Sequence, residues 1–201
     1  MYEKFGKRLF DICFSFIGII LLLPLFIAVS VLIKIDSRGA VFFKQKRMGF
    51  KEESFFLIKF RSMYSNQEKE KLSFEPGADY RITRFGRILR KTKIDELPQL
   101  FNVLKGEMSF VGPRPEVPKY REYFSGQYKR IFTVKPGITD ESSIKFIDEE
   151  KRLKSTSNPE KYYTEVILKE KLQINYKYAV SKISFKDDII IILKTLKYIV
   201  M

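Results

Sequence analysis

The residues best suited to chemistry gather around an adjacent pair of carboxylates, Asp95 and Glu96. Several arginines and lysines precede the pair, and a rigid Gly-Pro-Arg-Pro turn follows it at Gly112 to Pro115. Proline is tolerated in a helix only in the first turn, so Pro98 predicts a helix that begins near Asp95 and continues through Leu104. The carboxylates would then lie at the positive end of the helix dipole beside guanidinium groups, a setting that favours phosphates and other anions.

A purely structural interpretation fits the same residues. Asp95 would cap the predicted helix, and the neighbouring cations would form ordinary surface ion pairs. Spacing alone leaves both interpretations open. Two further cations, Lys59 and Arg61, alternate at the end of a strand-like run and are predicted to point to the same face. They too could bind a phosphate or simply be solvated.

The composition of the 201-residue chain narrows the chemistry. A formal net charge of +14, from 38 basic and 24 acidic residues, favours phosphorylated substrates, an anionic membrane surface or nucleic acid as partners. The sequence contains no histidine, which excludes a Ser-His-Asp triad and His-ligated zinc. The single cysteine, Cys13, excludes an internal disulfide and a cysteine-based metal site. Any metal would have oxygen ligands, which favours Mg²⁺ or Mn²⁺.

An uncharged run of 22 residues, Ile12 to Ile33, precedes all of these groups. It meets the length criterion for a membrane helix and exceeds the apolar core of an ordinary signal peptide. Pro24 lies close to its middle, where it removes a helical hydrogen bond and bends the axis. Each half is about 18 Å long, well short of the ~30 Å hydrocarbon core of a bilayer.

Basic residues flank this run on both sides, which favours keeping both of its ends in the cytoplasm. A helix–break–helix that enters one leaflet and returns explains both the short halves and the charges. A kinked spanning helix explains the residues equally well, and a buried core helix is the weaker third interpretation. Asp11, at the edge of the run, could pair with Arg8 or hold the entry geometry.

The remaining residues are interpreted as one α/β domain, mostly helical with a small β-hairpin. The hairpin is predicted from Val41-Phe43 and Phe55-Ile58, with its turn at Met48-Gly49-Phe50. The last helix is apolar but interrupted by lysines and too short to span, so it is predicted to be interfacial or packed on the core. Helices are predicted over residues 117–132, 158–179 and 189–200, and a surface helix and loop over 64–80.

The chain resembles the bacterial sugar transferases, or monotopic polyprenyl-phosphate phosphoglycosyltransferases. The resemblance covers nearly the whole chain, is strongest up to Ile138, and consists of motifs in the expected order and spacing. These motifs are Lys7-Asp11, Pro24, Val41-Gln45, Lys59-Met63, Phe85-Arg90, Asp95-Leu100, Asn102-Gly106 and Met108-Pro115.

This resemblance implies the small, single-domain type, since the chain opens directly on the apolar run. A re-entrant membrane helix over residues 1–36 would be fused to a cytoplasmic catalytic domain over 37–201, with amphipathic interfacial helices. The enzyme would lie on the cytoplasmic face of the bacterial inner (plasma) membrane. For the C-terminal helices, contact with the membrane or with a second protomer in a homodimer stays open.

The implied reaction moves a sugar-1-phosphate from a UDP-sugar to polyprenyl (undecaprenyl) phosphate and releases UMP. It would be the first membrane step in the assembly of a cell-envelope glycan. Asp95 matches the family nucleophile, which forms a covalent phosphosugar intermediate, and Asp95 with Glu96 would hold Mg²⁺. The matching residues that contact phosphate or shape the site are Lys59, Arg90, Pro113 and Arg114, and those of the membrane anchor are Arg8, Asp11 and Pro24.

The chain departs from the family pattern after Thr139. Many members continue with Gly-Trp, whereas this chain has Asp140-Glu141-Ser142-Ser143 and contains no tryptophan. The identity of the sugar therefore does not transfer. Two rival classes, a nucleic-acid-binding protein and a membrane-anchored scaffold without chemistry, explain less: the first lacks a recognisable binding module, and the second gives no reason for the carboxylate pair.

Overall fold

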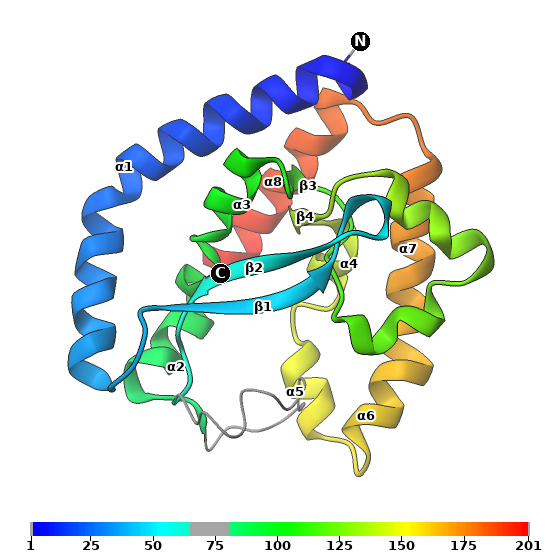
Figure 1. Cartoon of the computed structure of the whole chain (residues 1–201). Coiled ribbons are helices and arrows are strands. Elements are labelled where there is room, and N and C mark those ends of the chain that lie inside the picture. The colour runs from blue at the N-terminus through cyan, green and yellow to red at the C-terminus, as the bar shows by residue number, and fades with distance from the viewer. Residues whose placement is uncertain (1, 65–80, 201) are drawn as a thin grey trace.

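The computed structural model describes residues 2–64 and 81–200. A single long helix, α1 (Lys7–Asp36), follows one π-helical turn, η1 (Tyr2–Gly6). Figure 1 shows α1 wrapping around one side of the molecule, with the other described elements packed on its inner side. The region predicted as a surface helix and loop, residues 65–80 with Tyr64 at its edge, lies almost entirely outside the described residues.

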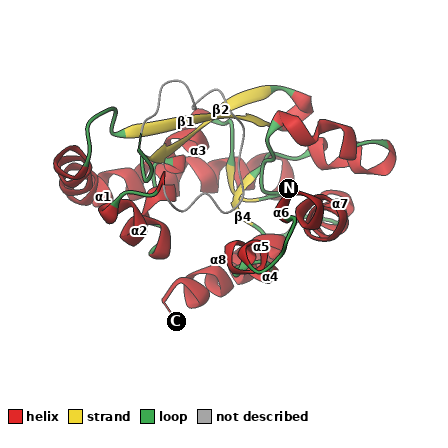
Figure 2. Ribbon diagram, turned by 90° about the horizontal axis from the view of Figure 1, so that it is seen from below, coloured by secondary structure: helices red, strands yellow, loops and turns green. Residues whose placement is uncertain are grey.

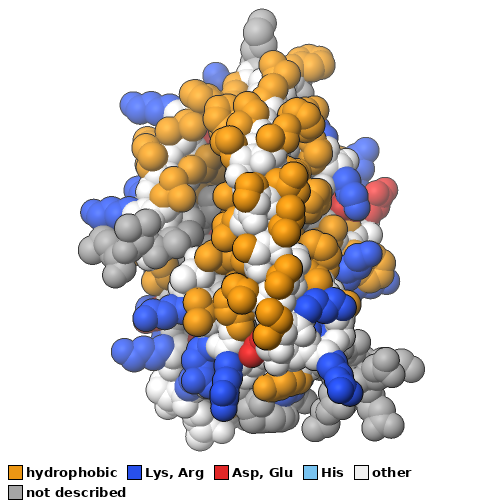
Figure 3. Space-filling model, turned by 90° about the vertical axis from the view of Figure 1, so that its left-hand side faces the viewer, with side chains coloured by type: hydrophobic (Ala, Val, Ile, Leu, Met, Phe, Trp, Pro, Cys, Tyr) orange, Lys and Arg blue, Asp and Glu red, His pale blue; other side chains and the backbone are white. Residues whose placement is uncertain are grey.

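Helix α1 is long and apolar enough to cross a membrane, and most of its side chains are exposed. Figure 3 shows apolar side chains covering its outer face, with Lys and Arg side chains clustered near one end. Pro24 lies inside the helix, and the axis bends partway along its length (Figure 1). The helix is continuous on both sides of this proline, so the predicted break takes the form of a bend.

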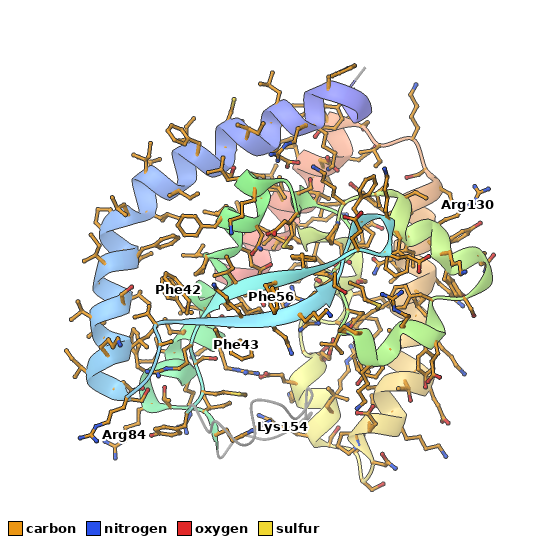
Figure 4. All side chains as sticks on the ribbon, in the orientation of Figure 1. Phe42, Phe43, Phe56, Arg84, Arg130 and Lys154 are labelled. Carbon is orange, nitrogen blue, oxygen red and sulfur yellow. The ribbon has the colours of Figure 1, made fainter. Side chains whose placement is uncertain are left out.

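The predicted hairpin is confirmed. Strands β1 (Phe42–Met48) and β2 (Ser54–Phe60) pair antiparallel, with Phe42 opposite Phe60 and Met48 opposite Ser54. A short 3-10 turn, η2 (Phe50–Glu52), connects them. The hairpin buries Phe60 almost completely, and the ring of Phe42, which Figure 4 labels, stacks on it and stays partly exposed.

The segment that carries the carboxylate pair is broken into three short helices. Helix α2 (Arg84–Lys91) is followed by a 3-10 turn, η4 (Ile94–Glu96), and by α3 (Gln99–Lys105). The prediction of one helix from Asp95 to Leu104 is therefore wrong in its start, because Pro98 forms the N-cap of α3. Lys93, with φ 58°, turns the chain sharply between α2 and η4.

Close backbone packing holds α2 against the end of the hairpin. The Thr83 hydroxyl accepts a hydrogen bond from the Gly86 amide and caps the helix. A Cβ at Gly86 would lie 2.0 Å from the Ser62 carbonyl oxygen, so only glycine fits there. The start of α2 is thus fixed beside the chain that leaves β2.

A second, parallel pair of strands was not predicted. Ser109 in β3 (Ser109–Val111) pairs with Gly137 in β4 (Gly137–Thr139). The long connection between these strands holds two 3-10 segments, η5 (Pro118–Tyr123) and η6 (Gly126–Thr133). The prediction of an α-helix over 117–132 is wrong, because both segments are 3-10 helices and the helical conformation is interrupted between them at Phe124 and Ser125.

The C-terminal third is helical, as predicted. Figure 2 shows α4, α5 and α8 on the side of α3 opposite the hairpin. The Asn158 side chain accepts from the Lys161 amide at 3.0 Å, which confirms the predicted N-cap, and the last helix begins at Phe185 instead of Ile189. The elements are α4 (Glu141–Lys145), α5 (Glu149–Lys154), α6 (Pro159–Tyr162), η7 (Tyr163–Ile167), α7 (Leu168–Val180) and α8 (Phe185–Val200).

Three groups of buried apolar side chains hold these elements together. The largest lies under the 3-10 segments and α7 and contains Tyr120 and Tyr163. A second joins α1 to β2 and α2 through Phe26, Phe60 and Leu89, and a third joins the hairpin to α3. The last two groups fix α1, β2 and α3 relative to one another, which places the carboxylate pair next to the hairpin.

Polar contacts fasten both ends of α1 to the domain. Arg8 donates to the carbonyl oxygens of Val103 and Leu104 at 2.7 and 2.9 Å, at the end of α3. Asp11 accepts from the Ser109 hydroxyl and the Phe110 amide at 3.0 and 3.1 Å. Asp11 and Arg8 thus bind different partners and fix the start of α1 to β3 and α3, while a role of Asp11 in the entry into the membrane stays a prediction.

At the other end of α1, Arg61 donates to the carbonyl oxygens of Ser37 and Arg38, both at 2.6 Å. These carbonyls directly follow the last turn of the helix, where a cation is favoured. Arg61 is buried in this position. Lys59 and Arg61 were predicted to point to the same face, either to bind a phosphate or to be solvated. In the structure they have separate partners, because Arg61 binds the end of α1 while Lys59 contacts Glu96.

Candidate active site

Glu96 is the centre of a compact ion-pair cluster. Its carboxylate accepts from the Arg114 guanidinium at 2.6 and 3.2 Å, one bond to each oxygen, and from the Lys59 ammonium at 2.7 Å. A bidentate arginine–carboxylate contact fixes the relative orientation of the two groups as well as the distance between them. Lys59 comes from β2, Glu96 from η4 and Arg114 from the turn after β3, so the cluster joins three separate parts of the chain.

Asn102 brings β2 and α3 into the positions that this cluster needs. Its side chain is completely buried. It accepts from the Ile58 amide at 3.0 Å and donates to the Phe56 carbonyl at 2.8 Å, as a further strand on the edge of the hairpin would. The same amide group donates to Glu107 at 2.7 Å. The strand that carries Lys59 is thereby fixed against the helix that follows Glu96.

The Gly-Pro-Arg-Pro turn is held by the parallel strand pair. The Pro113 carbonyl accepts from the Gly137 amide at 3.0 Å. The Arg114 amide donates to the Asp140 carboxylate at 3.0 Å, and Asp140 also caps α4 through the Ser143 amide. Asp140 belongs to the stretch that departs from the family pattern. It holds the backbone of Arg114, the residue that binds both carboxylate oxygens of Glu96.

Asp95 lies in a different environment from its neighbour. Its side chain is 7% exposed, and its Oδ1 atom is buried without a hydrogen-bond partner among the described residues. Burial raises the pKa of Asp95 above its ordinary value, while Lys59 acts in the opposite direction. A buried, unpartnered carboxylate oxygen is costly in free energy, so its presence points to a ligand or a reaction at this atom.

Glu96 shows the opposite electrostatic behaviour. Burial disfavours its charged form, but Arg114 and Lys59 outweigh burial and hold the pKa of Glu96 well below its usual range. Glu96 is therefore a permanent anion in a cationic clamp. Among the described residues, Asp95 is the member of the pair with an oxygen, Oδ1, that has no hydrogen-bond partner.

Arg90 does not join the cluster around Glu96. It forms an ion pair with Glu150 of α5, on the wall of a neighbouring cavity. It still lies close enough to Asp95 to favour the ionised carboxylate. The structure thus brings together Asp95, Glu96, Lys59 and Arg114 from the predicted site and leaves Arg90 beside them.

Two residues that position the cluster around Glu96, Asn102 and Asp140, were not predicted from the sequence. Asn102 carried a signal, since it is an amide within an apolar helical run. Asp140 carried a weaker one, as an acidic residue three positions before a serine, the spacing of an N-cap. Neither signal identifies the distant backbone groups that these side chains bind, because those contacts span 44 and 26 residues.

Among the described residues no group of three or more His, Cys, Asp or Glu side chains is placed to hold a metal ion. Both Glu96 oxygens are engaged by cations, whereas Asp95 Oδ1 is available. Mg²⁺ usually takes one or two carboxylates and completes its coordination with water and substrate phosphates. The residues present therefore fit a Mg²⁺ ion that Asp95 holds together with a phosphorylated substrate.

Fold and site together define a protein with an apolar, membrane-type helix clasped to a small domain whose carboxylate centre is surrounded by cations. Within that class, comparison with known sequences identifies the family. The family model described as "Bacterial sugar transferase" matches residues 2–201. The chain belongs to the bacterial sugar transferase family.

Several characterised relatives share 36–46% sequence identity with this chain. A UDP-N-acetylgalactosamine-undecaprenyl-phosphate N-acetylgalactosaminephosphotransferase of Aeromonas hydrophila is 46% identical over 67% of this chain and 33% of its own length. An undecaprenyl-phosphate glucose phosphotransferase of Komagataeibacter xylinus is 43% identical, over 71% and 28%. A UDP-glucose:undecaprenyl-phosphate glucose-1-phosphate transferase of Caulobacter vibrioides is 36% identical, over 69% and 53%. The matched region thus spans between about a quarter and a half of these relatives.

Proposed function

We propose that this protein transfers a sugar-1-phosphate from a UDP-sugar to undecaprenyl phosphate and releases UMP. The observation that carries the proposal is the buried, unpartnered Oδ1 of Asp95 beside the cation-clamped Glu96. The named relatives act on undecaprenyl phosphate, and two of their names specify a UDP-sugar. Their different sugars, N-acetylgalactosamine and glucose, leave the sugar of this enzyme to experiment.

In the first half-reaction, a carboxylate oxygen of Asp95 forms a bond to the phosphorus that carries the sugar. The bond from that phosphorus to the oxygen of UMP breaks, and UMP leaves with the electron pair. The product is a mixed anhydride between Asp95 and the sugar phosphate. In the second half-reaction, a phosphate oxygen of undecaprenyl phosphate attacks the same phosphorus, and the Asp95 carboxylate is regenerated.

The charges around Asp95 suit these two steps. Arg114 and Lys59 are positioned by Glu96, and each can also stabilise negative charge that develops on the phosphoryl oxygens. No histidine is needed to move a proton, because both nucleophiles and the leaving group are anions. When bound, Mg²⁺ supplies further neutralisation of the diphosphate, with Asp95 as its protein ligand.

The membrane arrangement belongs to the same proposal. The bent, exposed, apolar α1 enters the cytoplasmic leaflet of the bacterial inner membrane and returns, as the bend and its basic flanks support. This places the domain on the cytoplasmic face, where UDP-sugars are made. The lipid-linked acceptor then reaches the site from the bilayer.

The decisive experiment measures UMP release from a panel of UDP-sugars by the full chain in lipid, with Mg²⁺ and undecaprenyl phosphate. We expect release with at least one donor, abolished by EDTA and by Asp95→Asn. Asp148→Asn is the matched control, because this exposed aspartate pairs only with Arg152 of its own helix in the described structure. Full activity of Asp95→Asn would refute the nucleophile assignment, and a folded protein silent with every donor would refute the reaction.

A further inference from the structure

Strand β1 binds the chain directly after Arg114. Arg47 Nη1 donates to the Pro115 carbonyl at 3.0 Å, and the Met48 amide donates to the Glu116 carbonyl at 2.9 Å. One contact comes from a side chain and the next from the backbone, so the strand fixes both the place and the direction of the chain that leaves the Gly-Pro-Arg-Pro turn. The ring of Pro115 locks its φ angle, which carries this constraint to Arg114.

The same hairpin also carries Lys59. This lysine lies on β2 opposite Phe43 of β1. Lys59 and Arg114 are the two cations that bind Glu96. The hairpin therefore positions both of them, Lys59 as part of its own strand and Arg114 through Arg47. Figure 1 shows the hairpin running across the molecule from the side of α1, so it connects the membrane-type helix with both cations.

The side chain of Arg47 is itself held in a fixed orientation. It is 13% exposed, and its Nη1 lies 3.8 Å from the Glu116 carboxylate. Its Nη2 donates to the Gln45 side-chain oxygen at 2.7 Å. Burial lowers the pKa of Arg47, and Glu116 acts in the opposite direction. A guanidinium whose two ends have different partners cannot rotate without losing one of them, so the bond to the Pro115 carbonyl has a defined direction.

Glu116 has further partners in the C-terminal helices. It is buried, and its carboxylate accepts from the Tyr163 hydroxyl at 2.7 Å. Lys171 of α7 lies 4.0 Å from the same carboxylate and pairs with Glu149 of α5 at 2.5 Å. These contacts keep Glu116 paired when Arg47 is replaced, so a substitution of Arg47 is expected to leave the fold intact.

We infer that Arg47 is a positioning residue for Arg114. By binding the Pro115 carbonyl, it fixes the direction from which the Arg114 guanidinium meets both oxygens of Glu96. The inference rests on the proposed function, in which Arg114 stabilises charge on the transferred phosphoryl group. It gives β1 a part in the reaction that is transmitted entirely through the backbone of the turn.

The first test needs no turnover. Hydrogen exchange of the full chain in lipid nanodiscs, without substrate, should be about tenfold faster at the Arg114 amide in Arg47→Met, because one of the contacts that hold the turn is lost. The Ile58 amide, which Asn102 binds, should keep its protection. Lys46→Met, at the exposed preceding position of the same strand, is the matched control and should change neither amide.

The second test separates positioning from a general effect on the fold. With a donor that releases UMP, Arg47→Met should lower kcat about tenfold and leave the KM for the donor within about twofold, because a misdirected Arg114 stabilises the transition state less. In an Arg114→Lys background the same substitution should lower kcat by less than about twofold, since a lysine ammonium has no planar pair of donors to direct. Arg47→Lys keeps the charge opposite Glu116 and enters both tests if Arg47→Met does not fold.

Wild-type protection of the Arg114 amide in Arg47→Met would overturn the inference. An equal loss of kcat in both backgrounds would also overturn it, as would a faster-exchanging turn with unchanged kcat. The proposed function fails separately, if the wild type releases UMP from no donor, and hydrogen exchange then decides by itself whether Arg47 holds the turn.

Discussion

Asp95 and Glu96 are neighbours in the chain with opposite electrostatic roles. Burial without a partner raises the pKa of Asp95, whereas Arg114 and Lys59 overcome burial and lower the pKa of Glu96. Two neighbouring carboxyl groups whose pKa values are shifted in opposite directions can take different parts in one reaction. The oxygen that we propose as the nucleophile, Oδ1 of Asp95, has no partner among the described residues, which costs stability, as is common at functional sites.

That cost leads to a stability prediction for Asp95→Asn. The pKa of Asp95 is higher in the folded state, so the wild type loses stability as pH rises through that elevated pKa. At pH 7 the variant should be more stable by about 1–2 kcal/mol, a rise in Tm of about 2–8 °C, although we expect it to be inactive. Thermal unfolding in detergent at several pH values checks this.

The gain should disappear below about pH 4, where both the folded and the unfolded wild type carry a protonated Asp95. Asp148→Asn, at an exposed site, should show no such gain at any pH. A variant less stable than the wild type at neutral pH would contradict the view that Asp95 is buried without a partner.

Arg114→Lys tests the clamp on Glu96. Lysine keeps the charge but cannot contact both carboxylate oxygens, so kcat/KM should fall about 10–100-fold. The depressed pKa of Glu96 contributes stability that is present above its unfolded pKa and is lost as pH falls through the folded pKa. The variant should therefore be destabilised at pH 7 and by less at pH 3, as measured by denaturant unfolding. A destabilisation that is equal at both pH values would contradict this origin.

At the scale of elements, the site depends on contacts that do not touch the reacting atoms. The hairpin carries Lys59, and Asn102 ties that hairpin to α3. The turn with Arg114 depends on β4 and on Asp140. The geometry of the carboxylate pair is therefore set by side chains of α3 and of the α4 cap.

Asn102→Ala should uncouple these elements. The substitution leaves the Ile58 amide and the Phe56 carbonyl unpaired, so unfolding free energy should fall by about 2–4 kcal/mol and UMP release should fall with it. Lys105→Ala, on the exposed side of the same helix, is the control and should change neither quantity. Hydrogen exchange of the β2 amides provides an independent measurement: unchanged protection at Ile58 would contradict the proposed tie.

Pro24→Ala tests the membrane arrangement. Alanine restores the missing helical hydrogen bond, which favours a straight helix long enough to span. A cysteine added at the N-terminus, in a Cys13→Ser background, should then become accessible to a membrane-impermeant label from outside the cell. Leu23→Ala, the preceding exposed position, should keep the N-terminus protected. Unchanged protection in Pro24→Ala would count against the role of the bend.

Over the whole molecule, the elements that neighbouring residues determine are predicted correctly from the sequence. The long apolar helix and the β-hairpin are such elements, and both are confirmed. Prediction failed where a backbone detail decides the structure. Pro98 forms the N-cap of α3 and leaves Asp95 in a separate 3-10 turn, which begins after Lys93 adopts a left-handed conformation that is unusual outside glycine.

Residues of the site were recognised from the ordered series of motifs, but their partners were not. Sequence order placed Lys59 and Arg61 on one face, whereas tertiary packing gives each a separate partner. Asn102 and Asp140 bind backbone groups far away in the chain. Such contacts depend on how the elements pack against one another. A polar residue has many candidate partners in a sequence, so its position in the chain alone does not identify the one that it binds.

The clasp between α1 and α3 also has a consequence for biosynthesis. Arg8 binds a carbonyl 95 residues later in the chain, and Asp11 binds a hydroxyl 98 residues later. At about 5–20 residues per second, the ribosome makes these partners roughly 5–20 s after Arg8 and Asp11 themselves. In the proposed membrane arrangement, the apolar helix meets the bilayer during that interval, before Arg8 and Asp11 have their partners. On that proposal, the rest of the domain is completed against a helix that has entered the membrane first.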